Sequence, residues 1–336
     1  MFELGLKIRQ WWSNIKLRKN RENTAHQVHE TNVFAMAFGL FLKTLVLVTL
    51  SLVILFPFFF MFMISFMGKQ QALELSSNFS LIPQEFSPDN YTKAMGIYAA
   101  GDDVESLKKG VDYLPSLGFT FANVVFSVVV KILVTMLAGY AFSLKTWRFK
   151  KLLWSILISL LVLPEVALLS GQYWMVTRLD EAIKLKQDFL GMVAAVSVPF
   201  LASIFTALMF RNAFEAIPKR LKEVATVDGA VGAKYFFKIA VPMVTPTILT
   251  VTILTALASW NSYLWPALIS DNTFTVLSVW IFSVGQDLSD PANPRPMPSL
   301  KMAAAILAIA PMFIVYLLAR KWIMRSISRQ GSTIKG

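Results

Sequence analysis

Two charged residues, Lys131 and Glu165, interrupt otherwise apolar stretches of the chain. The connection between these stretches is centred on residue 148, and each charged residue lies 17 positions from that centre. If the stretches are antiparallel membrane helices rising 1.5 Å per residue, both side chains lie at one depth, roughly 20 Å from the hairpin's inner edge. A charge in hydrocarbon is costly and normally faces a partner. We therefore predict a Lys131–Glu165 ion pair near the bilayer midplane, which either fixes helix packing, the favoured alternative, or lines a pathway.

Residue types that support catalysis or metal binding are otherwise scarce. The sequence contains no Cys and only two His, His26 and His29, both in a basic N-terminal segment. We find no Gly-rich phosphate loop, nucleophile elbow or paired-carboxylate motif. The sequence therefore predicts neither a catalytic residue nor a metal site, and an integral-membrane enzyme is the weakest of the functional alternatives.

The composition indicates a membrane setting for these residues. Hydrophobic residues make up 56% of the 336 residues and charged residues only 15%, whereas soluble domains are about one quarter charged. We predict an all-α integral membrane protein with six transmembrane helices, because six apolar stretches are long enough to cross about 30 Å of hydrocarbon. Prolines at positions 57, 164 and 311 lie inside three of them and predict kinks. The predicted spans are residues 42–67, 117–144, 152–175, 189–210, 245–268 and 302–320.

The distribution of basic residues predicts the orientation of these spans. The connections on one side carry 21 Lys and Arg residues, and those on the other side carry eight. The positive-inside rule therefore places both termini in the cytoplasm and accounts for most of the net charge of +12 without a nucleic-acid partner. We expect a basic cytoplasmic segment over residues 1–33, which is either a helix on anionic lipid or a flexible tail, and an exposed extracytoplasmic cap over residues 68–116.

The predicted cytoplasmic loop over residues 211–242 has a distinctive spacing. It reads as a short amphipathic helix, a Gly stop, a second short helix and a proline that begins the next span. The loop resembles the EAA loop of ABC-importer permeases, in which Glu-Ala-Ala, three residues, Gly and nine residues precede Ile-x-Leu-Pro. Every spacing is kept, and two positions, Val224 and Val241, depart from the pattern by one apolar residue for another. The matching residues are Glu223, Ala225, Gly229, Ile239 and Pro242.

The resemblance extends over approximately residues 36–336 and is closest to the second permease of maltose-type carbohydrate importers. Residues 34–324 would form the permease domain and residues 325–336 a cytoplasmic tail. The further matching segments are Asn90-Tyr91, residues 138–142, residues 260–266 and the C-terminal residues 319–322 and 331–336.

The resemblance implies a non-catalytic subunit in a bacterial or archaeal inner membrane. Its partners would be a second permease, a dimer of ATP-binding subunits that holds ATP and Mg, and an extracytoplasmic solute-binding protein. The loop would form a coupling helix in a cleft of the ATPase. Ala225 and Gly229 would allow close approach, and Glu223 and Asp228 would pair with basic residues there. Closure of the ATPase would switch the permease from inward-facing to outward-facing.

The resemblance also implies a sugar or sugar-like solute. Aromatic faces with amide or hydroxyl groups bind sugars in apolar clefts, so Trp260, Asn261, Tyr263 and Glu165 are candidate pathway residues. Trp and Tyr are equally typical of the aromatic belt at a membrane interface. A homodimer of this chain stays open, as does a self-contained secondary carrier with Glu165 as its coupling site, although such carriers usually show several intramembrane carboxylates or an inverted repeat.

Overall fold

The computed structural model describes residues 10–13, 33–98, 112–144, 147–270, 273–287 and 295–332. The acidic part of the predicted outer cap around residues 101–105 and the two histidines lie outside these ranges. The chain divides into two compact units, Met1–Phe58 and Phe59–Gly336. The first unit contains most of the apolar helix α2 (Val33–Ser65), which continues into the second unit and contains Pro57.

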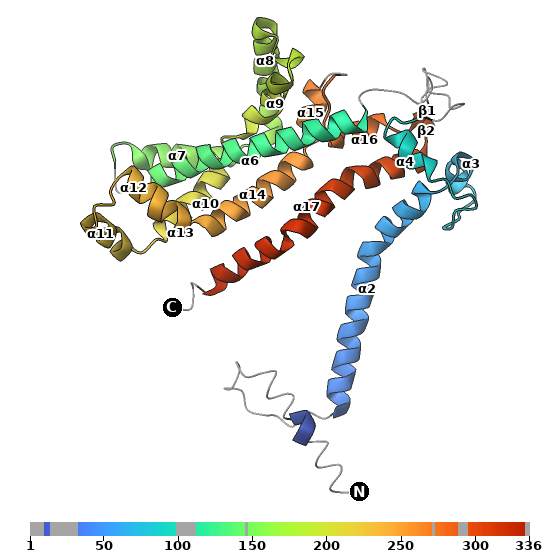
Figure 1. The fold of residues 1–336 in the computed structure, drawn as a ribbon, viewed down its shortest axis with the longest axis horizontal. Coiled ribbons are helices and arrows are strands. Elements are labelled where there is room, and N and C mark those ends of the chain that lie inside the picture. Colours follow the sequence, from blue (N-terminus) through green and yellow to red (C-terminus); the bar gives the residue numbers. More distant parts are fainter. Residues whose placement is uncertain are drawn as a thin grey trace. The chain divides into compact units, whose positions relative to one another are not determined.

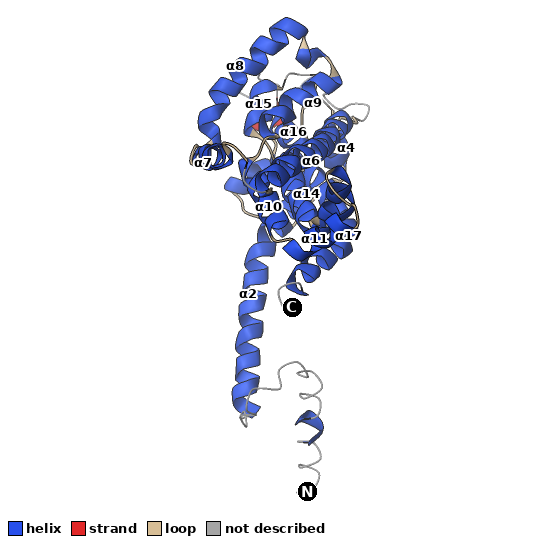
Figure 2. Cartoon of the chain, turned by 90° about the vertical axis from the view of Figure 1, so that its left-hand side faces the viewer, coloured by secondary structure: helices blue, strands red, loops and turns tan. Residues whose placement is uncertain are grey.

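The described chain is almost entirely helical, as predicted (Figure 2). Its only described strands, β1 (Gln286–Asp287) and β2 (Arg295–Pro296), pair antiparallel. The shorter helices of the second unit are α3 (Lys69–Leu73), α4 (Asp89–Ala94), α11 (Lys219–Val227), α12 (Ala233–Tyr235), α13 (Val241–Met243), α15 (Leu264–Ile269) and α16 (Leu277–Ser283). Its longer helices are α6 (Tyr113–Ser143), α7 (Lys150–Leu160), α8 (Glu165–Ile183), α9 (Phe189–Ser197), α10 (Ile204–Glu215), α14 (Thr245–Trp260) and α17 (Pro298–Ser332). Single turns cover Glu74–Ser76, Leu185–Gln187 and Val198–Phe200, and a π-helix covers Phe236–Ala240.

Three described helices, α2, α6 and α17, are each long and apolar enough to cross a membrane. Three further helix pairs pass the same test together but are bent by 99°, 67° and 69°. The described chain therefore has three candidate spans, or up to six if each bent pair is one span. All six predicted stretches coincide with one of these helices or pairs.

The prediction of a kink at Pro164 is wrong, because the helix breaks there. Helix α7 ends at Leu160, and α8 begins at Glu165 with Pro164 as its N-cap residue and a bend of 99°. Proline provides no backbone N–H and disfavours helical geometry in the residue before it, so an N-cap position suits it. Pro57 and Pro311 do lie inside helices, α2 and α17.

Helix α6 is the central element of the second unit. It runs beside α10 and α14 and also contacts α9 and α16 (Figure 1). Gly139 permits the close approach to α10, because an added Cβ would lie 2.5 Å from the Phe210 Cβ and 2.8 Å from the Arg211 amide nitrogen. The four residues Asn123, Ser127, Lys131 and Thr135 follow one face of α6 at intervals of four. The arrangement therefore directs polar side chains of the central helix toward its neighbours.

The predicted outer cap is partly ordered against the rest of its unit. Helices α3 and α4 both contact α17. The buried amide of Asn90 donates to the carbonyl oxygens of Ser65 and Met67, each at 2.9 Å, and so satisfies backbone groups just after α2. The Tyr91 and Ser65 hydroxyls are 2.7 Å apart. These contacts give a structural role to the Asn90-Tyr91 pair.

Candidate functional site

The loop over residues 211–242 forms the helix pair that its sequence predicted. Helix α11 follows Pro218, ends at Val227 and is capped by Asp228. Gly229 follows with a φ of +69°, and its amide donates to the Thr226 carbonyl at 3.1 Å. An added Cβ at Gly229 would meet nothing within 4 Å, so the left-handed backbone alone favours glycine there.

Helix α11 presents an apolar surface to its surroundings. The side chain of Val227 is 88% exposed and that of Val224 is 53% exposed. Glu223 and Asp228 are also exposed, and neither forms one of the ion pairs of the described residues. An exposed apolar face with flanking carboxylates is suited to a protein partner.

Ala225 does not belong to that surface. It is only 3% exposed and packs in one cluster with Phe214, Tyr235 and Phe236. In this structure the small side chain of Ala225 lets α11 lie close to its own unit, and its predicted role in contact with a partner stays a prediction. The C-terminal half of α11 is thus packed on its own unit through Ala225, and the opposite face is exposed.

The remaining motif residues lie where the loop joins α14. Ile239 is half-buried in the π-helix and packs against the same cluster, and Pro242 lies at the start of α13. A π-helix is rare and often marks a functional site. The rings of Tyr140, Phe214 and Phe236 contact one another in this cluster, with centroids 4.6–6.2 Å apart. The cluster therefore connects the loop to α6 and α10.

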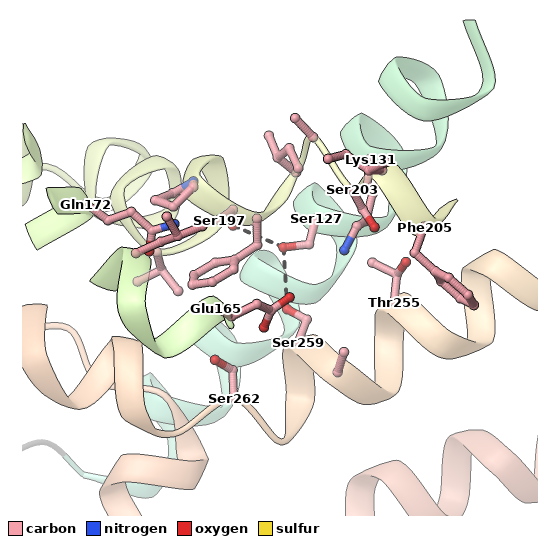
Figure 3. Close-up of a pocket in the computed structure, with 18 of the residues that line it drawn as sticks. Ser127, Lys131, Glu165, Gln172, Ser197, Ser203, Phe205, Thr255, Ser259 and Ser262 are labelled. Atoms are coloured by element: carbon pink, nitrogen blue, oxygen red, sulfur yellow. Dashed lines mark hydrogen bonds between the residues drawn. The ribbon is translucent and has the colours of Figure 1, made fainter. Parts of the chain in front are cut away.

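A second candidate site is a cavity of about 380 Å³ among α6, α8, α9, α10 and α14 (Figure 3). Four of its polar side chains form a closed set of hydrogen bonds. The Asn123 amide donates to Ser259 at 2.9 Å, Ser259 to Ser127 at 3.4 Å, Ser127 to Ser197 at 3.1 Å, and Ser197 to the Asn123 carbonyl at 2.6 Å. The helices thus enclose a polar wall within apolar spans.

Lys131 and Glu165 both line this cavity (Figure 3). Their side chains do not form the predicted direct ion pair in the described structure, although the Glu165 carboxylate acts electrostatically on the Lys131 amine. The prediction that Lys131 and Glu165 lie at the same depth assumed one straight helix over residues 152–175. The break before Glu165 removes that condition and places its carboxylate in the first turn of α8, where the helix dipole favours a negative charge.

The aromatic candidates at the end of α14 do not line the cavity. Trp260 is 6% exposed and packs against Phe121 with ring centroids 5.2 Å apart. Asn261 caps α14, and its amide donates to the Leu257 carbonyl at 2.9 Å. Tyr263 is exposed and its ring contacts Phe282. From residues 259–263, the side chains that line the cavity are instead those of Ser259 and Ser262.

The polar wall of the cavity was not predicted, although the sequence contains a signal for it. Asn123 and Ser127 precede Lys131 at intervals of four, and Thr255 and Ser259 lie four residues apart on α14, with Ser262 just after the helix. Residues three or four apart on a helix lie on one face. Read together with Lys131, these polar residues would have predicted a polar face on each helix.

An all-helical membrane chain with a polar cavity and an exposed loop helix has the architecture of a transport protein. Residues 94–329 match the family model described as binding-protein-dependent transport system inner membrane component. The chain belongs to this family and is a multi-pass inner membrane permease subunit of an ABC importer. Such permeases are non-catalytic and hold no cofactor.

Three known proteins illustrate the relationship. The probable ABC transporter permease protein MG189 homolog of Mycoplasma pneumoniae is 38% identical over 97% of this chain and 98% of its own length. The sn-glycerol-3-phosphate transport system permease protein UgpE of Yersinia pestis is 26% identical over 82% of this chain and 91% of its own. A chain of a bacterial ABC transporter that imports the acidic polysaccharide alginate shares the fold, with a TM-score of 0.65, 20% identity, and coverage of 88% of this chain and 99% of that one.

Proposed function

We propose that this permease forms, with a second permease, the pathway for a sugar or sugar-like solute. Relatives named for sn-glycerol-3-phosphate and alginate transport support a polyhydroxylated solute. The polar wall of the cavity supports the same solute class, because hydroxyl and amide groups hydrogen-bond to sugar hydroxyls. In this proposal an extracytoplasmic binding protein delivers the solute, and both termini of the chain lie in the cytoplasm.

We further propose that α11 couples this pathway to a dimer of ATP-binding subunits, which holds ATP and Mg. The observation that carries the proposal is the exposed face of α11 around Val224 and Val227, combined with the buried anchor at Ala225. An anchored helix transmits a push from a partner to its own unit, whereas a loosely held loop would absorb it. Glu223 and Asp228 would then pair with basic residues of the partner.

The test is to purify the tagged chain with its native neighbours in mild detergent and to measure co-eluting protein and ATPase activity. The variants Gly229→Asp and Gly229→Asn form a matched pair. Both residues tolerate a positive φ, so their backbones should be equally strained, and each adds a side chain where glycine would allow close approach of the partner. We expect both variants to reduce ATP-driven uptake at equal expression, and the difference between them to report the effect of the added charge.

Equal uptake by the wild type and Gly229→Asp would contradict the coupling role of this turn. Recovery of the folded chain without any ATP-binding subunit would contradict the assembly itself. That second result would favour the self-contained carrier with Glu165 as its coupling site.

A further inference from the structure

Lys131 is a cation in the cavity that forms no ion pair within the described part of the chain. Its ammonium group carries three hydrogen-bond donors and no acceptor. A cation placed among apolar spans is costly unless it faces a partner or a water-filled cavity. Lys131 therefore places a positive charge on the cavity wall, and the negative charge of Glu165 acts on it from the same cavity without a direct ion pair.

The rest of the polar wall offers several acceptors to a ligand. In the closed set formed by Asn123, Ser127, Ser197 and Ser259, each hydroxyl donates its only proton inside the set. These hydroxyl oxygens keep lone pairs that can accept from a ligand. Glu165 and Gln172 add further acceptors, and the hydroxyl groups of Ser203, Thr255 and Ser262 in the lining can both donate and accept.

The side-chain carbonyl of Gln172 is the cavity-lining member of four buried side-chain oxygens without a hydrogen-bond partner in the described chain, the others being in Ser116, Thr177 and Ser270. Its Oε1 atom is buried and has no hydrogen-bond partner in the structure. Buried polar atoms are nearly always paired, and an unpaired one calls for a ligand or a water. The cavity volume of about 380 Å³ falls within the usual range for small-molecule sites.

We propose that this cavity binds an anionic, hydroxyl-rich solute group, such as a sugar acid or a polyol phosphate, with Lys131 contacting the anionic group. The hydroxyl groups of the solute donate to Glu165, Gln172 and the serine oxygens. Lys131 matches the anionic group, and Glu165 matches the hydroxyl groups attached to it, so the one cation and the one carboxylate of the wall contact different parts of the solute. This assignment rests on the proposed function, because it names the solute class of the same pathway.

The natural absence of cysteine permits a direct test. Ser259→Cys places one thiol on the cavity wall, and the complex with its native neighbours is treated with anionic sulfonatoethyl or cationic trimethylammonioethyl methanethiosulfonate. Mass spectrometry of this chain gives the two reaction rates. Replacing Lys131 by Met should lower the ratio of the anionic to the cationic rate about tenfold, because one local positive charge acts on both reagents with opposite signs.

Lys131→Arg is the matched control and should keep the ratio of the parent. Lys131→Gln is a second uncharged variant in case the Met variant does not co-elute with its neighbours. The inference is overturned if removing the charge leaves the ratio within twofold of the parent, if Arg behaves like Met, or if neither reagent reaches the thiol.

A solute that binds in the cavity should slow the reaction of the thiol with the reagents, so this protection shows which anion binds. Glucuronate with glucose as its neutral control tests a carboxylate, and glycerol phosphate with glycerol tests a phosphate. We expect one or both anions to slow modification, and the Lys131→Met variant to lose about tenfold in protection. Equal protection by the neutral compounds would overturn the anion site.

These measurements separate the two proposals. Loss of co-eluting ATPase would refute the importer assembly, whatever the rate ratio is. An unchanged rate ratio in a complex that still contains its ATP-binding subunit would refute only the anion site.

Discussion

Gly139 provides a sharp test of how the central helix packs. A Cβ at this position would lie 2.5 Å from the Phe210 Cβ, 2.8 Å from the Arg211 nitrogen and 2.9 Å from the Ala207 oxygen, whereas ordinary van der Waals contact begins at 3.4 Å. Two of these neighbours are backbone atoms, so relief requires α6 and α10 to separate by several tenths of an ångström. Overpacking of this kind costs about 1–3 kcal/mol.

Gly118→Ala is the matched control for Gly139→Ala, because it lies on the same helix and its added Cβ would meet nothing within 4 Å. Both substitutions gain the same helix propensity, roughly 1 kcal/mol, so the difference between them isolates the packing cost. We expect the apparent melting temperature of Gly139→Ala to be lower than that of Gly118→Ala by several degrees, at about 2–4 °C per kcal/mol. The assay is thermal denaturation of the detergent-solubilised complex, followed by size-exclusion chromatography. Equal melting temperatures would refute the close approach of the two helices.

Three further predictions concern residues away from the coupling loop. Asn90→Ala should destabilise the outer cap by about 1–3 kcal/mol, because it leaves the Ser65 and Met67 carbonyls unpaired; limited proteolysis of the cap should accelerate, and exposed Asn78→Ala is the control. Burial raises the pKa of the Tyr91 hydroxyl, and the hydrogen bond with Ser65 lowers it by less, so the stability contribution of this group should be complete below about pH 10 and fall as the pH rises through the raised pKa. In melting curves Tyr91→Phe should make this dependence smaller than in the wild type, and an equal loss of stability above pH 10 in both proteins would contradict burial of the hydroxyl. Trp260→Ala should lower stability by about 3–5 kcal/mol without changing solute preference, and a change of preference at unchanged stability would return Trp260 to the pathway.

The sequence predicted the number and place of the apolar segments well but not their shape. A hydropathy window averages over Leu161–Leu163, which are as apolar as the helices on both sides, so the break was visible only through Pro164. The bend of 99° depends on what α8 packs against, and no local pattern encodes that. The depth of Glu165 could therefore not be counted along the chain.

In the candidate sites, too, the sequence predicted local features but not the contacts between distant residues. The spacing from Glu223 to Pro242 predicted the helix pair, because a glycine with positive φ and a proline at a helix start act locally. Burial of Ala225 and Trp260 depends on distant aromatic residues, so sequence alone placed both at a functional surface. The cavity was not predicted because its serines are unremarkable individually and gain meaning only when two helices bring them together.

The aromatic cluster that Ala225 packs against connects α11 to the central helix α6. Tyr140 belongs to that cluster and lies nine residues along α6 from Lys131, about 14 Å at 1.5 Å per residue. Close-packed interiors are nearly incompressible, so a displacement of α11 cannot be absorbed where Ala225 meets the rings. It must be passed to α6 as a rotation or an axial shift, and the amine and serines of the cavity wall move with it. Under the two proposals above, the affinity of the cavity for its solute and the position of α11 therefore depend on each other through α6.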